Sequence, residues 1–333
     1  MQDKLLTIAE AEALIKKERL LVIFGEEALL TALPQGNWIG GTMPYFYLKG
    51  TKGVFDQEHV FVTDFTDYAK EWTVKSYGAD DIKNIAVQGF DNGFQFTIIP
   101  AYQPVHQEFA VNADSYDKLY DNPVIGLVAG VSLEDLSNGR LTKTFNGLTG
   151  EVFIEKAVTL HIGLQDHQVA RLEIVNIFGQ DHSDDVVIEP IETSFKQTDC
   201  LINGEKKNLY DYLIEHDIDT KYPLVCDYAG AGINASFEFL KADERAVTFY
   251  APLFKGYKYK FSKKAAVSYA EAFRERVEQL EDRNNMIFNC NCILNYMYGD
   301  LENHDIGYSG PAAFGEIAYS LVNQTFTYLV IDQ

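Results

Sequence analysis

The first apolar residues of the chain recur at the spacing of an amphipathic helix. They occur every three or four positions over residues 8–15, and Thr7 followed by Glu10 has the spacing of a capping box. This pattern predicts a helix over residues 8–19. An unbroken apolar run at residues 20–24 follows directly and predicts a buried strand.

The most regular helical pattern lies near the C-terminus. Apolar residues between Val267 and Leu280 fall on one helical face, and Arg274 and Glu278 form an i,i+4 pair on another. The pattern predicts a helix over residues 267–283. Other patterns predict helices at residues 26–33, 80–85 and 209–216, a helix or loop at 102–120, and strands at 38–42, 55–63, 93–99, 124–128, 236–240, 245–250, 256–261, 286–291 and 325–331.

Turn residues between β-like runs predict two hairpins. Gln165-Asp166-His167 joins runs at residues 152–164 and 169–178, and a second hairpin over residues 191–208 turns at Asn203-Gly204. Asn-Gly is a strong hairpin signal because both residues tolerate the positive φ of a type I′ turn.

The succession of short helices and strands predicts a mixed α+β fold. A chain of 333 residues exceeds the usual size of a single hydrophobic core. We therefore expect two lobes, each a mostly antiparallel sheet with packed helices. The expected division gives one lobe over residues 1–195 and another over residues 196–333.

The composition excludes several classes of protein. The chain has 28 Lys and Arg against 49 Asp and Glu, which is a formal net charge of −21. Nucleic acids and anionic membranes both require local positive charge, so neither is an expected partner. The apolar runs are too short to span a membrane, and the N-terminal segment lacks a signal-peptide pattern. Four scattered cysteines favour a cytoplasmic protein with reduced thiols.

Three motifs carry possible chemistry, and each has a simpler structural interpretation. Residues 230–235 match G-x-G-x-x-A, but a strand pattern follows where a dinucleotide fingerprint requires a helix. Cys290-Asn-Cys292 places two thiols on one strand face, where zinc would need two further ligands. The acidic residues 181–185 lack the order of an EF-hand loop. We therefore expect a glycine turn, two buried cysteines and a solvated loop, with no metal site.

The C-terminal third contains a characteristic order of glycine, asparagine and cysteine elements. The hairpin turn Ile202-Asn203-Gly204 precedes the helix at residues 209–216, and Phe288-Asn-Cys290 follows the long helix. The remaining elements are Ala251-Pro-Leu-Phe-Lys-Gly256, Gly310-Pro-Ala-Ala-Phe-Gly315-Glu316-Ile317 and Asn323-Gln-Thr325. This order resembles the C-terminal half of FIST proteins, a family of intracellular signal-transduction sensor domains. The opening Val22-Ile-Phe-Gly25 with Trp38-Ile-Gly40-Gly41-Thr42 is similar to the N-terminal half of that family.

The resemblance implies a cytoplasmic sensory protein that binds a small polar metabolite, such as an amino acid, between its lobes. It also implies signalling through a separate protein, and it favours binding over catalysis. The glycines allow close backbone approach, and the polar side chains offer hydrogen bonds to a ligand. The expected ligand-binding residues are Gly40, Gly41, Thr42, Asn289, Cys290, Gly315, Glu316, Asn323 and Thr325.

Two alternative functions remain open at this stage. Some FIST-like proteins are described as haem-based nitric-oxide sensors, and one histidine in an apolar pocket suffices to ligate haem iron. The candidates are His59, His106, His161, His167, His182, His216 and His304. The second alternative is an enzyme of unrecognised type that uses Glu316 or Cys290 as an acid, base or nucleophile.

Overall fold

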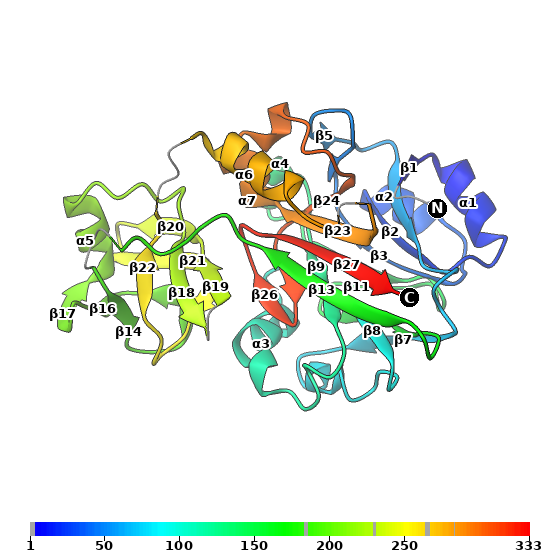
Figure 1. Cartoon of the computed structure of the whole chain (residues 1–333), viewed down its shortest axis with the longest axis horizontal. Coiled ribbons are helices and arrows are strands. Elements are labelled where there is room, and N and C mark those ends of the chain that lie inside the picture. Colours follow the sequence, from blue (N-terminus) through cyan, green and yellow to red (C-terminus); the bar gives the residue numbers. More distant parts are fainter. Residues whose placement is uncertain (1–3, 183–185, 229–230, 264–266, 283) are drawn as a thin grey trace.

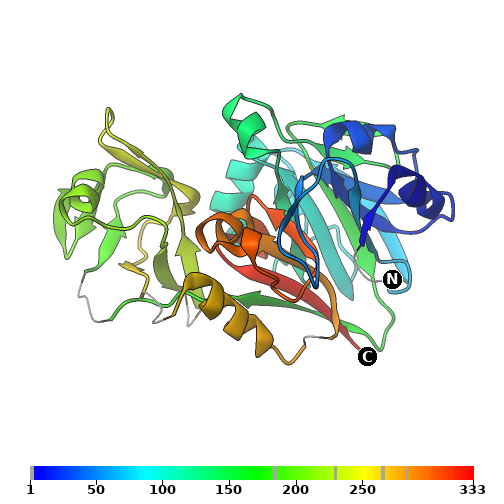
Figure 2. The same ribbon diagram turned by 90° about the horizontal axis from the view of Figure 1, so that it is seen from above.

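The computed structural model describes residues 4–182, 186–228, 231–263, 267–282 and 284–333. It is a mixed α+β structure, as the sequence predicts, with a large body and a smaller lobe at one side (Figures 1 and 2). The smaller lobe comprises the strands and helix between residues 188 and 261, and we call it the inserted lobe.

The body contains three six-stranded sheets. Sheet 1 has the order β1 (Lys4–Leu6), β6 (Val60–Asp64), β2 (Leu21–Gly25), β3 (Trp38–Thr42), β10 (Thr144–Asn146) and β11 (Glu151–Phe153). Sheet 2 has the order β26 (Ser320–Val322), β25 (Glu316–Ala318), β9 (Val124–Ala129), β8 (Gly93–Pro100), β12 (Ala157–Gly163) and β7 (Glu71–Tyr77). Sheet 3 has the order β13 (Val169–Val175), β27 (Phe326–Asp332), β23 (Met286–Cys292), β24 (Gly310–Ala313), β4 (Tyr45–Tyr47) and β5 (Val54–Phe55).

Aromatic side chains join the three sheets in a shared core. Phe24 of sheet 1 lies 6.5 Å from Phe96 of sheet 2, measured between ring centroids. Phe96 lies 4.7 Å from Phe288 of sheet 3. Phe46 of sheet 3 in turn stacks on Phe61 of sheet 1 at 5.4 Å. All five rings are fully buried, so each sheet turns one face toward the same interior.

Helices cover the outer face of each sheet. Sheet 1 carries α1 (Ile8–Ile15) and α2 (Glu27–Ala32), sheet 2 carries α3 (Pro104–Asn112), and sheet 3 carries α6 (Tyr269–Glu278) and α7 (Ile293–Tyr298). Each sheet also has a parallel pair joined by one of these helices: β2 with β3, β8 with β9, and β23 with β24. The remaining short helices of the body are η1 (Ile82–Asn84), η2 (Ala113–Ser115), α4 (Leu133–Ser137) and η3 (Leu301–Asn303).

The inserted lobe has its own hydrophobic core between two sheets and one helix. One sheet has the order β17 (Glu205–Asn208), β16 (Asp199–Ile202), β14 (Ile188–Pro190), β22 (Tyr259–Phe261), β18 (Leu224–Tyr228) and β19 (Ala231–Ala235). The other has the order β15 (Ser194–Gln197), β21 (Ala246–Leu253) and β20 (Phe237–Lys241), and the helix is α5 (Leu209–Glu215). The core includes Leu209, Leu213 and Phe249, all nearly inaccessible to solvent.

Strand pairing crosses the expected division between residues 195 and 196. The last strand, β27, pairs with β13, and β25 pairs with β9 in the N-terminal part of the chain. β24 likewise pairs with β4. The chain therefore leaves the body after β13, forms the inserted lobe, and returns through α6 to complete sheets 2 and 3.

Local signals predicted several elements correctly. The capping box at Thr7 and Glu10 is present, and α1 ends at Ile15, earlier than the expected residue 19. The predicted Asn203-Gly204 turn joins β16 to β17. The helix predicted over residues 267–283 corresponds to α6, which spans Tyr269–Glu278 and starts at a capping box of Ser268 and Glu271.

The hairpin predicted at residues 165–167 is wrong. β12 and β13 do follow one another along the chain, but β12 pairs with β7 and β8, while β13 pairs with β27. The two strands belong to different sheets.

Two predicted motifs fall partly outside the described residues, namely Gly230 of the glycine motif and residues 183–185 of the acidic loop. Strands β19 and β20 occupy the residues after Gly230, so no helix follows the glycine motif. None of the helices in the described ranges is long and apolar enough to cross a membrane.

Candidate functional site

The nine residues predicted to bind a ligand are all buried, and the structure separates them into two groups. Gly40, Gly41 and Thr42 lie on β3 of sheet 1. The other six lie on or beside β23, β25 and β27, where sheets 2 and 3 meet.

The paired glycines lie within the strand predicted over residues 38–42, and packing explains them. A Cβ atom added to Gly40 would lie 2.6 Å from the carbonyl oxygen of Ile23. A Cβ on Gly41 would lie 2.6 Å from Cγ2 of Ile98 on the facing sheet. The Thr42 hydroxyl accepts a hydrogen bond from the backbone N–H of Lys143 at 3.0 Å. Gly41 therefore permits close contact between sheets 1 and 2, and Gly40 permits close approach of β2 and β3 within sheet 1.

Glu316 lies fully buried at the start of β25 and is held by the start of β27. The backbone N–H and the hydroxyl of Thr325 both donate to its Oε1, at 3.1 and 2.5 Å. Its Oε2 is inaccessible and has no hydrogen-bond partner in the described structure. Burial raises the pKa of Glu316 to about 8, although the bonds from Thr325 act in the opposite direction. At neutral pH the carboxyl group is therefore mostly protonated.

The two cysteines beside this carboxyl group are buried and protonated. Cys292 lies within hydrogen-bonding range of Glu316, and burial raises the pKa of both Cys290 and Cys292 well above the usual value. A nucleophilic cysteine requires a thiolate and access to a substrate. Fully buried Cys290 offers neither, so this arrangement does not suit the nucleophile of the enzyme alternative.

The residues between β26 and β27 connect the body to the inserted lobe. Asn323 Oδ1 accepts from the backbone N–H and hydroxyl of Ser236, at 3.2 and 2.6 Å. The Asn234 amide donates to the carbonyl oxygens of Asn323 and Gln324 at 3.1 and 3.2 Å. The Gln324 amide donates to the carbonyl oxygen of Lys221 at 3.0 Å. Asn323 thus belongs to a buried polar network that fixes the lobe to the body.

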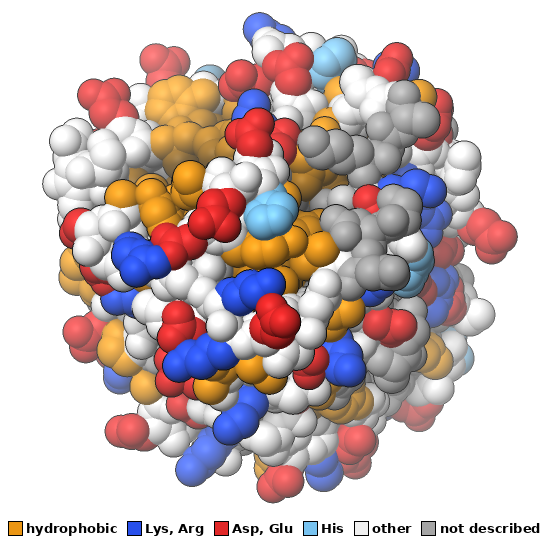
Figure 3. Space-filling view, turned by 90° about the vertical axis from the view of Figure 1, so that its left-hand side faces the viewer, with side chains coloured by type: hydrophobic (Ala, Val, Ile, Leu, Met, Phe, Trp, Pro, Cys, Tyr) orange, Lys and Arg blue, Asp and Glu red, His pale blue; other side chains and the backbone are white. Residues whose placement is uncertain are grey.

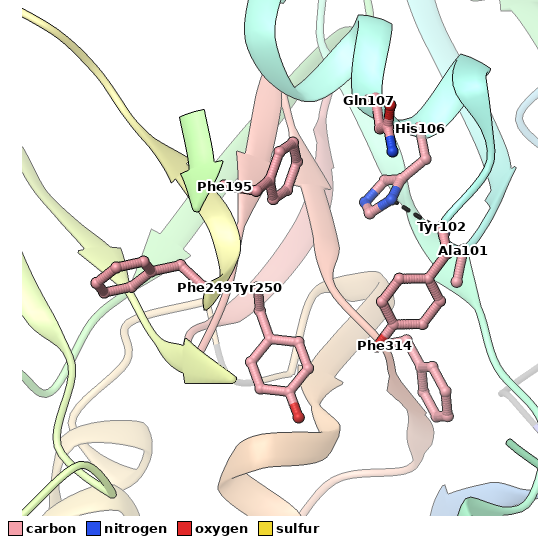
Figure 4. Close-up of a pocket in the computed structure, with 8 residues that line it drawn as sticks. All are labelled: Ala101, Tyr102, His106, Gln107, Phe195, Phe249, Tyr250 and Phe314. Atoms are coloured by element: carbon pink, nitrogen blue, oxygen red, sulfur yellow. Dashed lines mark hydrogen bonds between the residues drawn. The ribbon is translucent and has the colours of Figure 1, made fainter. Parts of the chain in front are cut away.

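A pocket lies at another part of the same junction. Body residues Tyr102, His106 and Phe314 form one side, and Phe195 and Tyr250 of the inserted lobe form the other (Figure 4). The cavity volume is about 50 Å³. Helix α3 also contributes to a second pocket that contains residues of both parts of the molecule, including Ala110, Cys226, Tyr257 and Leu321.

Among the described residues that line the first pocket, only His106 has a ring nitrogen. Its Nδ1 accepts a hydrogen bond from the backbone N–H of Tyr102 at 3.2 Å (Figure 4). Burial lowers the pKa of His106 to about 4, so the ring is neutral at physiological pH. Since Nδ1 accepts, the proton resides on Nε2, which is inaccessible and has no hydrogen-bond partner in the described structure.

His106 is one of the seven histidines considered as haem ligands, and no sequence pattern connects it with a lobe junction. Haem iron would require the lone pair of Nε2, whereas the bond from Tyr102 places a proton there. A cavity of about 50 Å³ is also far too small for the macrocycle. His106 as arranged here therefore does not fit haem. Within the described ranges, no group of three His, Cys, Asp or Glu side chains is arranged to hold a metal ion.

The aromatic residues of the pocket carried no sequence signal. Tyr102, Phe195, Tyr250 and Phe314 are distant along the chain and belong to unrelated local patterns. The backbone of Tyr102 is nevertheless distinctive. This residue lies two positions after the end of β8, and its φ of 62° is unusual for a non-glycine residue.

Comparison with known proteins gives a family and no function. No curated protein matches the sequence. A family model covers residues 6–332, which is nearly the whole chain. The chain therefore belongs to DUF6976, a family of unknown function.

Proposed function

We propose that this chain is a cytoplasmic sensory protein that binds a small molecule at the junction between its body and its inserted lobe. The observation that carries the proposal is the pocket at this junction, which contains an unpaired buried hydrogen-bond donor and side chains from both parts of the molecule. A ligand that contacts both parts changes the free energy of one relative position more than another. Binding is thereby coupled to lobe position.

The connections between the two parts support such a movement. The inserted lobe is joined to the body by two chain segments, one after β13 and one before α6 (Figure 1). The polar network around Asn323 lies at one part of the junction, and the aromatic pocket lies at another. In this proposal the polar network is a fixed contact between lobe and body, and the aromatic pocket is the site that a ligand fills. A hinged ligand-binding protein has this arrangement.

A separate protein would read the lobe position, as the resemblance to FIST sensors implies. Apolar side chains lie among charged ones on the outer end of the inserted lobe (Figure 3). Ile214 and Phe239 of this lobe are more than half exposed, which suits protein–protein contact. We propose no catalysis: Glu316 and Cys290, the candidate reactive groups, are fully buried.

Distance measurement between two labels tests the proposal. The native cysteines are buried, and burial raises the pKa of Cys200 to about 12 and of Cys226 to about 11, so introduced cysteines will react preferentially. Labels at Lys83→Cys on the body and Asp243→Cys on the lobe report lobe position. A panel of metabolites is screened for a rise in melting temperature, and hits are tested for a change in label distance.

We expect at least one metabolite to stabilise the protein and shift the label distance. Tyr250→Ala, which removes one wall of the pocket, should abolish both effects. Tyr120→Ala, at a tyrosine that is 57% exposed on the body, should leave both unchanged. Stabilisation without any change in distance would contradict the coupling of ligand to lobe position, and binding that persists in Tyr250→Ala would place the ligand elsewhere.

A further inference from the structure

We propose that the junction pocket selects a planar aromatic ring with a hydrogen-bond acceptor on its edge, and that Nε2–H of His106 donates to this acceptor. The inference rests on the proposed function, since it names the class of ligand for the same pocket. It differs from the amino acid expected from the sequence, because the described lining is largely aromatic and the available buried group is a donor.

The hydrogen bond between Tyr102 and His106 has a defined direction. The Tyr102 N–H is a donor, so the Nδ1 atom that faces it must accept. In a neutral imidazole the other nitrogen then carries the proton. The side chain of His106 is only 6% exposed, and its Nε2–H has no hydrogen-bond partner in the described structure. An unsatisfied buried donor is costly, so an occupant of this pocket is favoured when it brings an acceptor.

The space in front of that donor has aromatic walls. The ring of His106 lies 6.1 Å from that of Phe195 and 6.5 Å from that of Tyr102, between centroids. Tyr250 and Phe314 complete the walls (Figure 4). Aromatic side chains surround a flat ligand with offset or edge-to-face contacts.

Access to the pocket requires movement, because a cavity of about 50 Å³ holds water and not a ring. Tyr102 is 44% exposed, and the other aromatic walls Phe195, Tyr250 and Phe314 are partly exposed. The hydroxyl of Tyr102 also bonds to the carboxylate of Glu238 on the inserted lobe. Release of this contact frees Tyr102 to rotate and lets the lobe move, so a ring can enter without disruption of either core.

Three small rings of similar size test the inference on the intact protein at neutral pH. Pyridine has an acceptor and no donor, pyrrole has a donor and no acceptor, and benzene has neither. Nuclear magnetic resonance of the histidine ring nitrogens measures the tautomer of His106 and titrates each probe. We expect the Nε2–H tautomer, about five-fold tighter binding of pyridine than of benzene, and a shift of the His106 Nε2 resonance with pyridine only.

A matched pair of variants separates the donor from the shape of the residue. His106→Gln keeps both an acceptor and an N–H donor in its side-chain amide, whereas His106→Met loses the nitrogen acceptor and the N–H donor. The pyridine preference should persist in His106→Gln and vanish in His106→Met. If a variant fails to fold, the comparison of probes on the wild-type protein still decides the matter.

The outcomes distinguish the two proposals. Equal binding of the three rings, measured at the His106 ring resonances, or a preference for pyrrole, would overturn the ligand class and leave the junction as the binding site. The Nδ1–H tautomer, with Nε2 unprotonated, would also overturn it. No response of these resonances to any ring would remove the pocket as an aromatic site, whereas the proposed sensory function would still stand or fall by the metabolite screen and the label distances.

Discussion

At the residue scale, burial determines what the chemically suggestive side chains do. Glu316, Cys290 and Thr325 are residue types that bind ligands at surfaces, and the structure places them on or beside β25, β23 and β27. Sequence alone could not show that the site between sheets 2 and 3 is closed to solvent. Inside that closed site the carboxyl group gains a proton, and its role becomes a hydrogen-bonded contact between β25 and β27.

The protonation of Glu316 predicts a pH dependence of stability. The pKa of this carboxyl is about 8 in the folded protein against an ordinary value of 4.5, so the folded state holds a proton that the unfolded state loses. The contribution to stability is complete below pH 4.5 and is lost as pH rises toward 8. The expected loss is about 1.4 kcal/mol per pH unit within that interval. Glu316→Gln keeps a neutral polar side chain and should remove this slope.

Urea unfolding of both proteins at several pH values measures the effect. Buried neutral His106 acts in the opposite direction, because its lowered pKa makes the unfolded state the better proton acceptor. The difference between wild type and Glu316→Gln cancels that contribution. The free energy of unfolding of the variant should therefore rise relative to wild type between pH 5 and 8. Parallel curves would show that Glu316 titrates normally in the folded state.

Gly40 offers a second residue-level test, between packing and ligand contact. An added methyl group would lie 2.6 Å from a backbone oxygen, which cannot move as freely as a side chain. We expect Gly40→Ala to lower the free energy of unfolding by about 1–3 kcal/mol. Gly179→Ala is the control, since its added Cβ would meet no atom within 4 Å. Equal stability of the two variants in urea would contradict the packing role.

At the element scale, local signals predicted what local energies determine. Thr7 and Ser268 start helices through side-chain bonds to residues three positions ahead, so sequence spacing alone identifies them. Partner choice between strands is a long-range property. Residues 165–167 have the composition of a hairpin turn, yet β13 pairs with β27, which lies about 150 residues later along the chain. No local pattern encodes that choice.

The Asn203-Gly204 turn gives an element-level prediction. Both residues have positive φ, 52° and 81°, and the space around Gly204 is open. Gly204→Ala should therefore destabilise the hairpin by backbone strain alone, by about 1–2 kcal/mol. Hydrogen exchange of β16 and β17 measures the effect. Gly179→Ala, which has no positive φ, should leave exchange in its own segment unchanged or slower.

At the scale of the whole molecule, the inserted lobe is the feature that sequence reasoning did not identify. The expectation of two lobes placed the division at residue 195, which lies within β15 of the inserted lobe. No linker composition marks the points where the chain leaves the body after β13 and returns to it before α6. The candidate pocket could not be predicted for the same reason, as it exists only where the lobe meets α3.

The polar network at the junction should control how tightly the lobe is held. Ser236 of the lobe reaches Asn323 of the body through two hydrogen bonds, and both residues are buried. Asn323→Ala removes the acceptor and leaves buried donors unpaired, which costs about 1–3 kcal/mol. If the lobe moves as a unit, this cost should appear as faster hydrogen exchange across β20 and β21 with little change in β8 and β12 of the body.

Asn303→Ala, at an exposed residue of η3 in the body, is the matched control. Uniform acceleration throughout the molecule would instead mean that body and lobe unfold as one unit, and a lobe that cannot loosen by itself could not transmit ligand binding by changing its position.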